Sequence, residues 1–106
     1  MHVIVVGAGE VGSYVAERLS REGHDVAIIE IDGNKLRQLD DDLDVLTIKG
    51  SGTHPDALRR AGVDQADLLV AVSSNDEVNL ISSMLAKSIG VERTIVRIEA
   101  SELRGT

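Results

Sequence analysis

The segment Val3–Ala16, which reads VIVVGAGEVGSYVA, constrains the possible folds of this chain more than any other. Four β-branched residues lead directly into Gly7, and a helical pattern follows, with further glycines at positions 9 and 12. In this G-x-G-x-x-G spacing the first glycine permits a tight turn, the second lets a pyrophosphate approach the backbone, and the third lets the helix pack closely on the strand. The segment therefore predicts a phosphate-binding turn at a helix N-terminus, and a tight turn without a ligand is the alternative.

The rest of the chain alternates between apolar, β-rich runs and helical patterns. We expect strands at His2–Val6, Asp25–Ile29, Asp44–Ile48, Asp67–Val72 and Thr94–Ile98. We expect helices at Glu10–Arg21, Gly33–Leu39, Pro55–Ala61 and Asn75–Ile89, and a further helix beginning at Ala100. The periodicity of the two long helices predicts buried side chains at Val11, Val15 and Leu19 on the first, and at Val78, Ile81, Met84, Leu85 and Ile89 on the second.

Strands that alternate with helices are joined by right-handed crossovers and lie parallel in one sheet. We therefore predict an α/β fold, a doubly wound, Rossmann-like sheet of five strands in the order 3-2-1-4-5. Residues 1–106 are expected to form one domain, because a chain of this length builds a single core. A nucleotide would lie at the carboxyl ends of the strands, where the order reverses between the first and the fourth.

Composition excludes several classes of function. The chain has no cysteine, which excludes disulfides, thiolate zinc sites and cysteine nucleophiles, and its 3 histidines have no metal-binding spacing. The net charge of -7 argues against binding to nucleic acid or to an anionic membrane surface. No apolar run approaches the ~20 residues of a membrane span, so we expect a cytoplasmic domain without direct membrane insertion. The acidic bias fits a surface adapted to high salt or an ordinary acidic domain.

Acidic residues follow the second predicted strand. Glu30 comes about 20 residues after the glycines, where a carboxylate accepts hydrogen bonds from the adenosine ribose and repels a 2′-phosphate. This position favours NAD or an adenine mononucleotide over NADP. Asp32 is interpreted first as a helix N-cap and second as an adenosine contact. Lys35 and Arg37 could attract a phosphate or form a solvated helix face.

Two further loops lie at the predicted carboxyl edge. Gly50–Thr53, after the third strand, could bring its backbone close to the adenine or form an ordinary turn. After the fourth strand, Ser73 would face the crevice and could meet the second ribose or the nicotinamide. Ser74 and Glu77 have the spacing of a capping box. Arg97, the one basic residue of its apolar run, could approach the ligand or form an ion pair.

Residues for catalysis are not recognisable in the sequence. There is no Ser/His/Asp set and no Lys/Tyr pair after the fourth strand, and no segment could form the second wall that holds a substrate against a nicotinamide. We therefore do not expect an enzyme. The cofactor-binding half of an NAD-dependent dehydrogenase is the alternative, and a non-binding scaffold for dimerisation is a third interpretation.

Three long segments carry a resemblance to a known family. They read VIVVGAGEVGSYVAERLSREGHDVAIIEID, VLTIKGSGTHPDALRRAGVDQADLLVAVSSNDEVNL and TIVRI, and together they cover nearly the whole chain. They resemble the nucleotide-binding N-terminal domain of the TrkA family of potassium-uptake regulators, also called the KTN or RCK domain. The motifs around GSGTHP and SSNDEVN are more specific than the glycine spacing.

The resemblance implies an NAD(H)-binding domain, with ATP or ADP bound in some relatives. It implies that such domains form homodimers or larger rings beneath a membrane potassium transporter or channel, at the inner face of the membrane. The glycines would hold the phosphates, Glu30 the ribose, Ser51 and Gly52 the adenine, and Val72 and Ser73 the crevice wall. With its neighbours, the predicted cofactor site comprises Gly7, Ala8, Gly9, Glu10, Val11, Gly12, Glu30, Ile31, Asp32, Lys35, Gly50, Ser51, Gly52, Val72, Ser73 and Arg97.

One departure from the family pattern favours NAD(H) over a triphosphate. Relatives that respond to ATP can carry a basic residue between the second and third glycines, and this chain has Glu10 there. The family commonly continues with a sixth strand, a crossover helix and a C-terminal domain, so the resemblance implies that residues 1–106 are part of a longer chain. Nucleotide occupancy would then shift the arrangement of paired domains and act on the transporter without making a bond.

Overall fold

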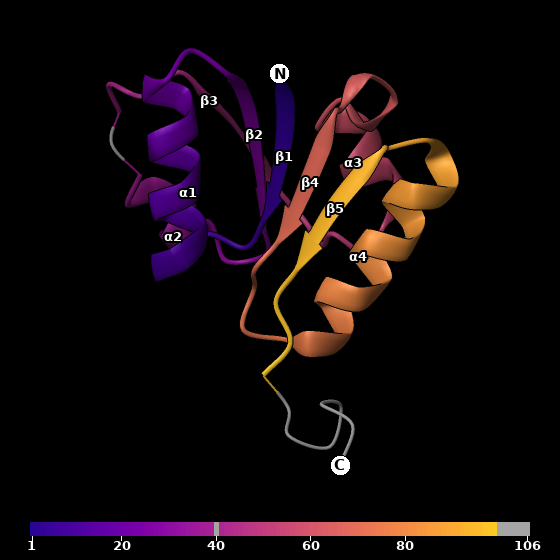
Figure 1. Ribbon diagram of the computed structural model, residues 1–106. Coiled ribbons are helices and arrows are strands. Elements are labelled where there is room, and N and C mark those ends of the chain that lie inside the picture. The colour runs from indigo at the N-terminus through magenta and orange to yellow at the C-terminus, as the bar shows by residue number, and fades with distance from the viewer. Residues whose placement is uncertain (40, 100–106) are drawn as a thin grey trace.

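A computed structural model describes residues 1–39 and 41–99. Five parallel strands form one sheet in the order β3-β2-β1-β4-β5, which confirms the predicted fold class and strand order (Figure 1). The strands are β1 (His2–Val6), β2 (Asp25–Glu30), β3 (Val45–Lys49), β4 (Leu68–Ala71) and β5 (Arg93–Val96). The helix predicted from Ala100 lies outside the described residues.

Helices cover both faces of the sheet, so the fold is doubly wound. In Figure 1, α1 and α2 lie on one side of the strands and α3 and α4 on the other. The helices are α1 (Glu10–Arg21), α2 (Gly33–Arg37), α3 (Pro55–Arg60) and α4 (Asp76–Ile89), with a 3-10 turn, η1 (Val63–Gln65), before β4. Within the described residues, no helix is both long enough and apolar enough to cross a membrane.

The central strand β1 is buried on both faces, which explains its uninterrupted apolar sequence. Val3 and Val5 pack in a cluster with residues of α1, whereas Ile4 and Val6 pack in a second cluster with residues of α3 and α4. Both clusters are aliphatic. Successive side chains of β1 thus enter different clusters, and this packing on both faces holds the carboxyl end of β1 in place where the glycine turn begins.

The predicted strand boundaries need small corrections, and the largest is at β5. This strand ends at Val96 instead of Ile98, and β4 ends at Ala71 instead of Val72. The side chain of Asn79, on α4, donates hydrogen bonds to the carbonyls of Ser73 and Arg97, both at 3.0 Å. Because a helix side chain takes these carbonyls, the two strands do not continue as a ladder beyond this point.

The other boundaries shift by one or two residues. β2 extends to Glu30, β3 starts and ends one residue later than predicted, and α2 ends at Arg37 instead of Leu39. Helix α4 starts at Asp76, one residue later than expected. These shifts are of the size at which helix and strand ends ordinarily fray.

Several side chains predicted to be buried on the helices are exposed. Val11 is 42% exposed, Ile81 44% and Met84 69%. The helices approach the sheet through smaller residues instead, Gly12 and Ala16 on α1 and Asn79, Ser82 and Ala86 on α4. Close approach favours small side chains, and the buried Ser82 satisfies its hydroxyl by donating to the Val78 carbonyl at 2.6 Å. The apolar periodicity was therefore wrong for these three residues, whereas the other predicted residues are partly buried and pack against the two core clusters, namely Val15, Leu19, Val78, Leu85 and Ile89.

Candidate nucleotide site

A cavity of about 410 Å³ opens at the carboxyl ends of the strands, between the glycine turn after β1 and the loop after β4. Every predicted site residue lines this pocket except Ala8 and Gly12. Sequence reasoning did not assign five other lining residues to the site, namely Val6, Ile29, Ser74, Asn75 and Val78. Most of these are apolar strand or helix residues, or a capping position, and only their spatial placement brings them to the pocket.

The glycine turn forms the first wall of the pocket, and the fold itself requires two of its glycines. Gly7 has a φ of +105°, in the left-handed region, and a Cβ there would lie 2.7 Å from the Ser73 Cα. A Cβ on Gly12 would lie 1.8 Å from the Gly7 carbonyl oxygen. Backbone conformation and packing therefore require glycine at position 7, and packing requires it at position 12.

Gly9 differs from both neighbours. Its φ of -75° and ψ of -162° are open to any residue, and a Cβ built there would meet nothing within 4 Å. The first N–H groups of any helix lack an intrahelical acceptor, and Gly9, the N-cap of α1, provides no side-chain acceptor for them. The pocket wall at Gly9 is therefore open backbone with available donors, which suits a phosphate.

The Glu30 side chain, at the end of β2, holds the glycine turn in place through hydrogen bonds. It is only 8% exposed, one carboxylate oxygen accepts the Ala8 N–H at 2.7 Å, and the other accepts the Asp32 N–H at 2.9 Å. Each oxygen keeps a second lone pair, so a ribose hydroxyl could still donate to it. The structure thus gives Glu30 a role in holding the turn, which sequence reasoning missed, and its predicted ribose contact stays a prediction.

The first residues of α2 border the same end of the pocket. Asp32 accepts the Asn34 N–H at 2.9 Å and caps α2, which confirms the N-cap interpretation. Lys35 is exposed and lines the pocket, so it is available to an anionic ligand. Arg37 is not among the lining residues and donates to the Asn34 side chain.

The Gly50–Thr53 loop packs closely against β1 and α4. A Cβ on Gly52 would lie 2.6 Å from both the Ser82 Oγ and a Val6 methyl group. Ser51 and Thr53 join their hydroxyls at 2.7 Å, and the Ser51 Oγ also accepts the Thr53 N–H at 3.2 Å. The glycine in this loop is thus explained by packing, while the loop still borders the pocket.

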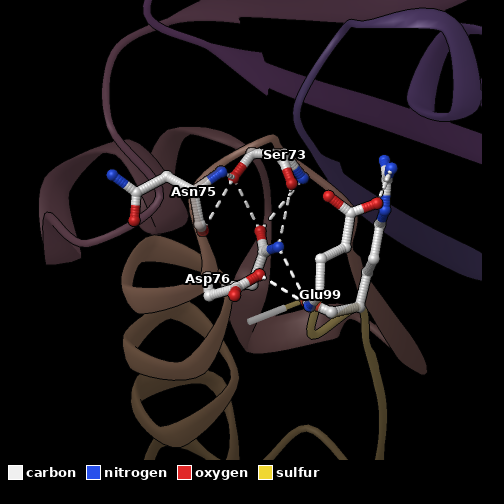
Figure 2. A network of polar contacts seen from close by, with 6 residues as sticks. Ser73, Asn75, Asp76 and Glu99 are labelled. Carbon is white, nitrogen blue, oxygen red and sulfur yellow. Dashed lines mark hydrogen bonds and ion pairs between the residues drawn. The ribbon is translucent and has the colours of Figure 1, made fainter. Parts of the chain in front are cut away.

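The second wall of the pocket, which we call the far wall, is lined by Val72, Ser73, Ser74, Asn75, Val78 and Arg97. Its hydrogen bonds depend on Asn79, on α4. This side chain is fully buried, and its Oδ1 accepts the Ser73 N–H at 3.0 Å and the Ser73 hydroxyl at 2.7 Å. With its two donated bonds to Ser73 and Arg97, Asn79 fills all four of its hydrogen-bonding positions. Figure 2 shows this network around the labelled Ser73, Asn75, Asp76 and Glu99. The Ser73 hydroxyl is therefore engaged within the wall.

The start of α4 corrects the predicted capping box. Asn75 is the N-cap and its Oδ1 accepts the Val78 N–H at 3.1 Å. Ser74 precedes the cap and lines the pocket, and Glu77 lies in the first helical turn. The helix begins one residue later than the Ser74–Glu77 spacing indicated, so that prediction was wrong.

The ion-pair interpretation of Arg97 is confirmed, and its predicted approach to a ligand stays a prediction. Arg97 lines the pocket, and its guanidinium forms an ion pair with Glu99. The Glu99 N–H donates to the Asp76 side chain at 3.0 Å, which attaches this segment to the start of α4. Among the described residues, no cluster of three or more His, Cys, Asp or Glu side chains could hold a metal ion.

These features define the class of the protein. A parallel sheet whose strand order reverses between β1 and β4, a glycine turn leading into α1, and a pocket over that reversal define a Rossmann-like nucleotide-binding domain. Residues 3–104 match the TrkA-N domain family, and the chain belongs to that family. This confirms the resemblance drawn from the glycine, GSGTHP and SSNDEVN segments.

The curated relatives are considerably longer than this chain. It is 41% identical over 102 residues to the Trk system potassium uptake protein TrkA of Halomonas elongata, an alignment covering 95% of the chain and 22% of that protein. It is 44% identical over 102 residues to a Trk system potassium uptake protein TrkA homolog of Archaeoglobus fulgidus, covering 96% of the chain and 23% of that protein. The chain thus spans less than a quarter of either relative.

Solved structures share the fold. The Kef CTD of Shewanella denitrificans in its AMP-bound form superposes with a TM-score of 0.74 at 25% identity, over 90% of this chain and 57% of that chain. The NAD(P)-binding domain of an exopolyphosphatase-related protein from Archaeoglobus fulgidus gives a TM-score of 0.78 at 22% identity, over 94% of this chain and 74% of that chain. The second likeness is one of fold alone.

Proposed function

We propose that this domain binds NAD(H) reversibly and acts as a regulatory domain of a Trk-type potassium uptake system or potassium channel. The observation that carries the nucleotide part is Gly9, where glycine is present although neither backbone conformation nor packing requires it. A ligand that must approach the backbone closely accounts for that glycine.

The pocket has room and chemistry for an adenine nucleotide. Its volume of about 410 Å³ falls within the range of roughly 300–1,000 Å³ typical of small-molecule sites. We place the adenosine between Glu30 and the Ser51–Gly52 backbone and the first phosphate on the first turn of α1. The second phosphate and the rest of a dinucleotide would then extend along the far wall. This is the direction in which a dinucleotide crosses a reversal of strand order.

Charge around the glycine turn favours NAD(H) among the adenine nucleotides. Glu10 is exposed, lines the pocket and places a negative charge beside the phosphate position. It would repel the dense charge of a triphosphate more strongly than the two single charges of a pyrophosphate diester. The AMP-bound form of the Kef domain supports the general preference for adenine nucleotides.

The regulatory part of the proposal rests on the relatives. The two curated relatives described above share more than 40% sequence identity with this chain, and both are named Trk system potassium uptake proteins. We propose that the domain works at the inner face of the membrane, paired with further copies of itself, and that nucleotide binding favours one arrangement of the pair. Such a mechanism needs only a difference in affinity between two arrangements, and no bond is made or broken.

Calorimetric titration with NAD⁺, NADH, AMP, ADP and ATP tests the proposal, with Gly9→Ser as the diagnostic variant. Serine is a good N-cap, so the fold should keep its stability, while its side chain obstructs the ligand and takes up the N–H donors. Losing charge-assisted hydrogen bonds to a phosphate should weaken NAD(H) binding by about ten-fold or more.

Gly33→Ser is the matched control. Gly33 opens α2 and does not line the pocket, and a Cβ there would meet nothing nearer than 3.4 Å. We expect unchanged affinity in this variant. Failure of the wild-type chain to bind any of the five nucleotides would contradict the proposal, and a strong preference for ATP would contradict the role given to Glu10.

A further inference from the structure

The segment after β5, residues 97–99, joins the pocket to the start of α4, and it contains the ion pair between Arg97 and Glu99. We propose that this ion pair is an anion-exchange site: the second phosphate of an adenine nucleotide displaces the Glu99 carboxylate from Arg97 and so releases Glu99 from the far wall. This inference rests on the proposed nucleotide binding and adds how the bound ligand is communicated.

Arg97 is the cation that a ligand meets on the far wall. Among the residues that line the pocket, Lys35 is the other cation, and it lies on α2, beside the adenosine end. The remaining far-wall residues are neutral: Val72, Ser73, Ser74, Asn75 and Val78. A negatively charged group that extends from the glycine turn toward β4 would therefore be attracted to Arg97.

The ion pair is of a kind that exchanges easily. The side chains of Arg97 and Glu99 are 37% and 54% exposed, and exposed pairs of this kind add little stability because water solvates both partners. A phosphate group presents several oxygens to the planar guanidinium and can accept two parallel hydrogen bonds. A nucleotide already held at the glycine turn would thus compete effectively with one solvated carboxylate.

The backbone bonds determine which partner moves. Arg97 is held on both sides of its backbone: its N–H donates to the Ala71 carbonyl and its carbonyl accepts from Asn79, both at 3.0 Å. Glu99 is attached through its N–H to Asp76, at a solvent-exposed hydrogen bond (Figure 2). Exchange at the guanidinium would therefore leave Arg97 in place and loosen Glu99, together with its hydrogen bond to the start of α4.

The proposal predicts that ligands with two phosphates engage Arg97 and that a ligand with one phosphate does not. NAD⁺, NADH and ADP each carry a second phosphate, whereas AMP has a single phosphate that the glycine turn can hold alone. We expect the first three to engage Arg97 and AMP not to.

Glu99→Gln tests the competition directly. Removing the competing carboxylate should tighten NAD⁺ and ADP binding by about two- to five-fold, the scale of an exposed ion pair, and leave AMP binding unchanged. Arg97→Gln should weaken NAD⁺ and ADP binding by about ten-fold, again with little effect on AMP.

Glu22→Gln is the matched control. Glu22, the C-cap of α1, forms an exposed ion pair with Arg18, and neither residue lines the pocket. This variant changes the net charge as Glu99→Gln does, so it reports any general electrostatic effect on binding. Equal affinities in the two variants would overturn the inference while the nucleotide proposal stands.

Amide hydrogen exchange at Glu99 provides a second readout. Adding NAD⁺ or ADP to the wild-type chain should accelerate exchange of the Glu99 amide, and adding AMP should not. Unchanged exchange with all three bound ligands would overturn the release of Glu99. Failure of every nucleotide to bind would instead contradict the proposed function, and this inference with it.

Discussion

The two walls of the pocket are built in different ways. The first wall is backbone: Gly7 and Gly12 permit a tight turn, and Glu30 holds that turn through two N–H groups. The far wall is held by side chains, with Asn79 joining Ser73 to Arg97. Local chain geometry therefore shapes most of the first wall, with Glu30 as a distant support, whereas contacts between distant segments determine the far wall.

This difference has a consequence for how the walls can change. A turn whose glycines are required by steric contact has few alternative conformations, so it suits a fixed phosphate site. A wall held by side-chain hydrogen bonds and one exposed ion pair can exchange partners at small cost. We expect the ligand to bind at the first wall and its effect to be transmitted through the far wall.

The largest effect is expected on the first wall, from Gly12→Val. The added side chain would overlap the Gly7 carbonyl oxygen, only 1.8 Å from the new Cβ, and α1 would have to move off the sheet. Overpacking of this kind costs about 3 kcal/mol or more in unfolding free energy. Urea unfolding followed by circular dichroism measures the loss. A stability close to wild type would show that the turn is less constrained than its contacts indicate.

A smaller but substantial effect is expected on the far wall, from Asn79→Leu. Leucine has a similar volume but leaves the Ser73 N–H and two carbonyls without their partner. Such buried unsatisfied groups should lower the unfolding free energy by about 2–3 kcal/mol.

Asn34→Ala is the control for this variant, because Asn34 is exposed and should change stability by less than about 0.5 kcal/mol. Thermal unfolding of both variants checks the expectation. Equal stabilities would mean that the Asn79 network does not hold the far wall.

The smallest effect is expected at the start of α4, where Asn75→Ala removes the helix cap. We expect a loss of about 1 kcal/mol, typical of an N-cap, as measured by the shift of the urea midpoint. Ser74→Ala should be nearly neutral by the same measurement. A larger loss at Ser74 would restore the capping box that the sequence spacing indicated and the structure does not contain.

The sequence predicted the fold and the first wall well because both depend on local patterns. Apolar runs of β-branched residues predicted the strands, and the glycine spacing predicted the turn at Gly7 and Gly12. The sequence did not predict the contacts between segments. The periodicity of α4 predicted a buried Met84, which is 69% exposed, and it assigned no role to Asn79, which is fully buried. The role of a buried polar residue on a helix can be assigned only when its hydrogen-bond partners are known.

By itself, then, the sequence determined the parallel α/β architecture, the strand order and the position of the phosphate turn, because short-range patterning and steric rules dictate them. Only the tertiary structure decided how Glu30 holds the turn, why Gly52 must be glycine, and how Asn79 and the Arg97–Glu99 pair form the far wall. These features depend on groups far apart in the chain that meet only after folding, and no local pattern specifies which of them will be partners.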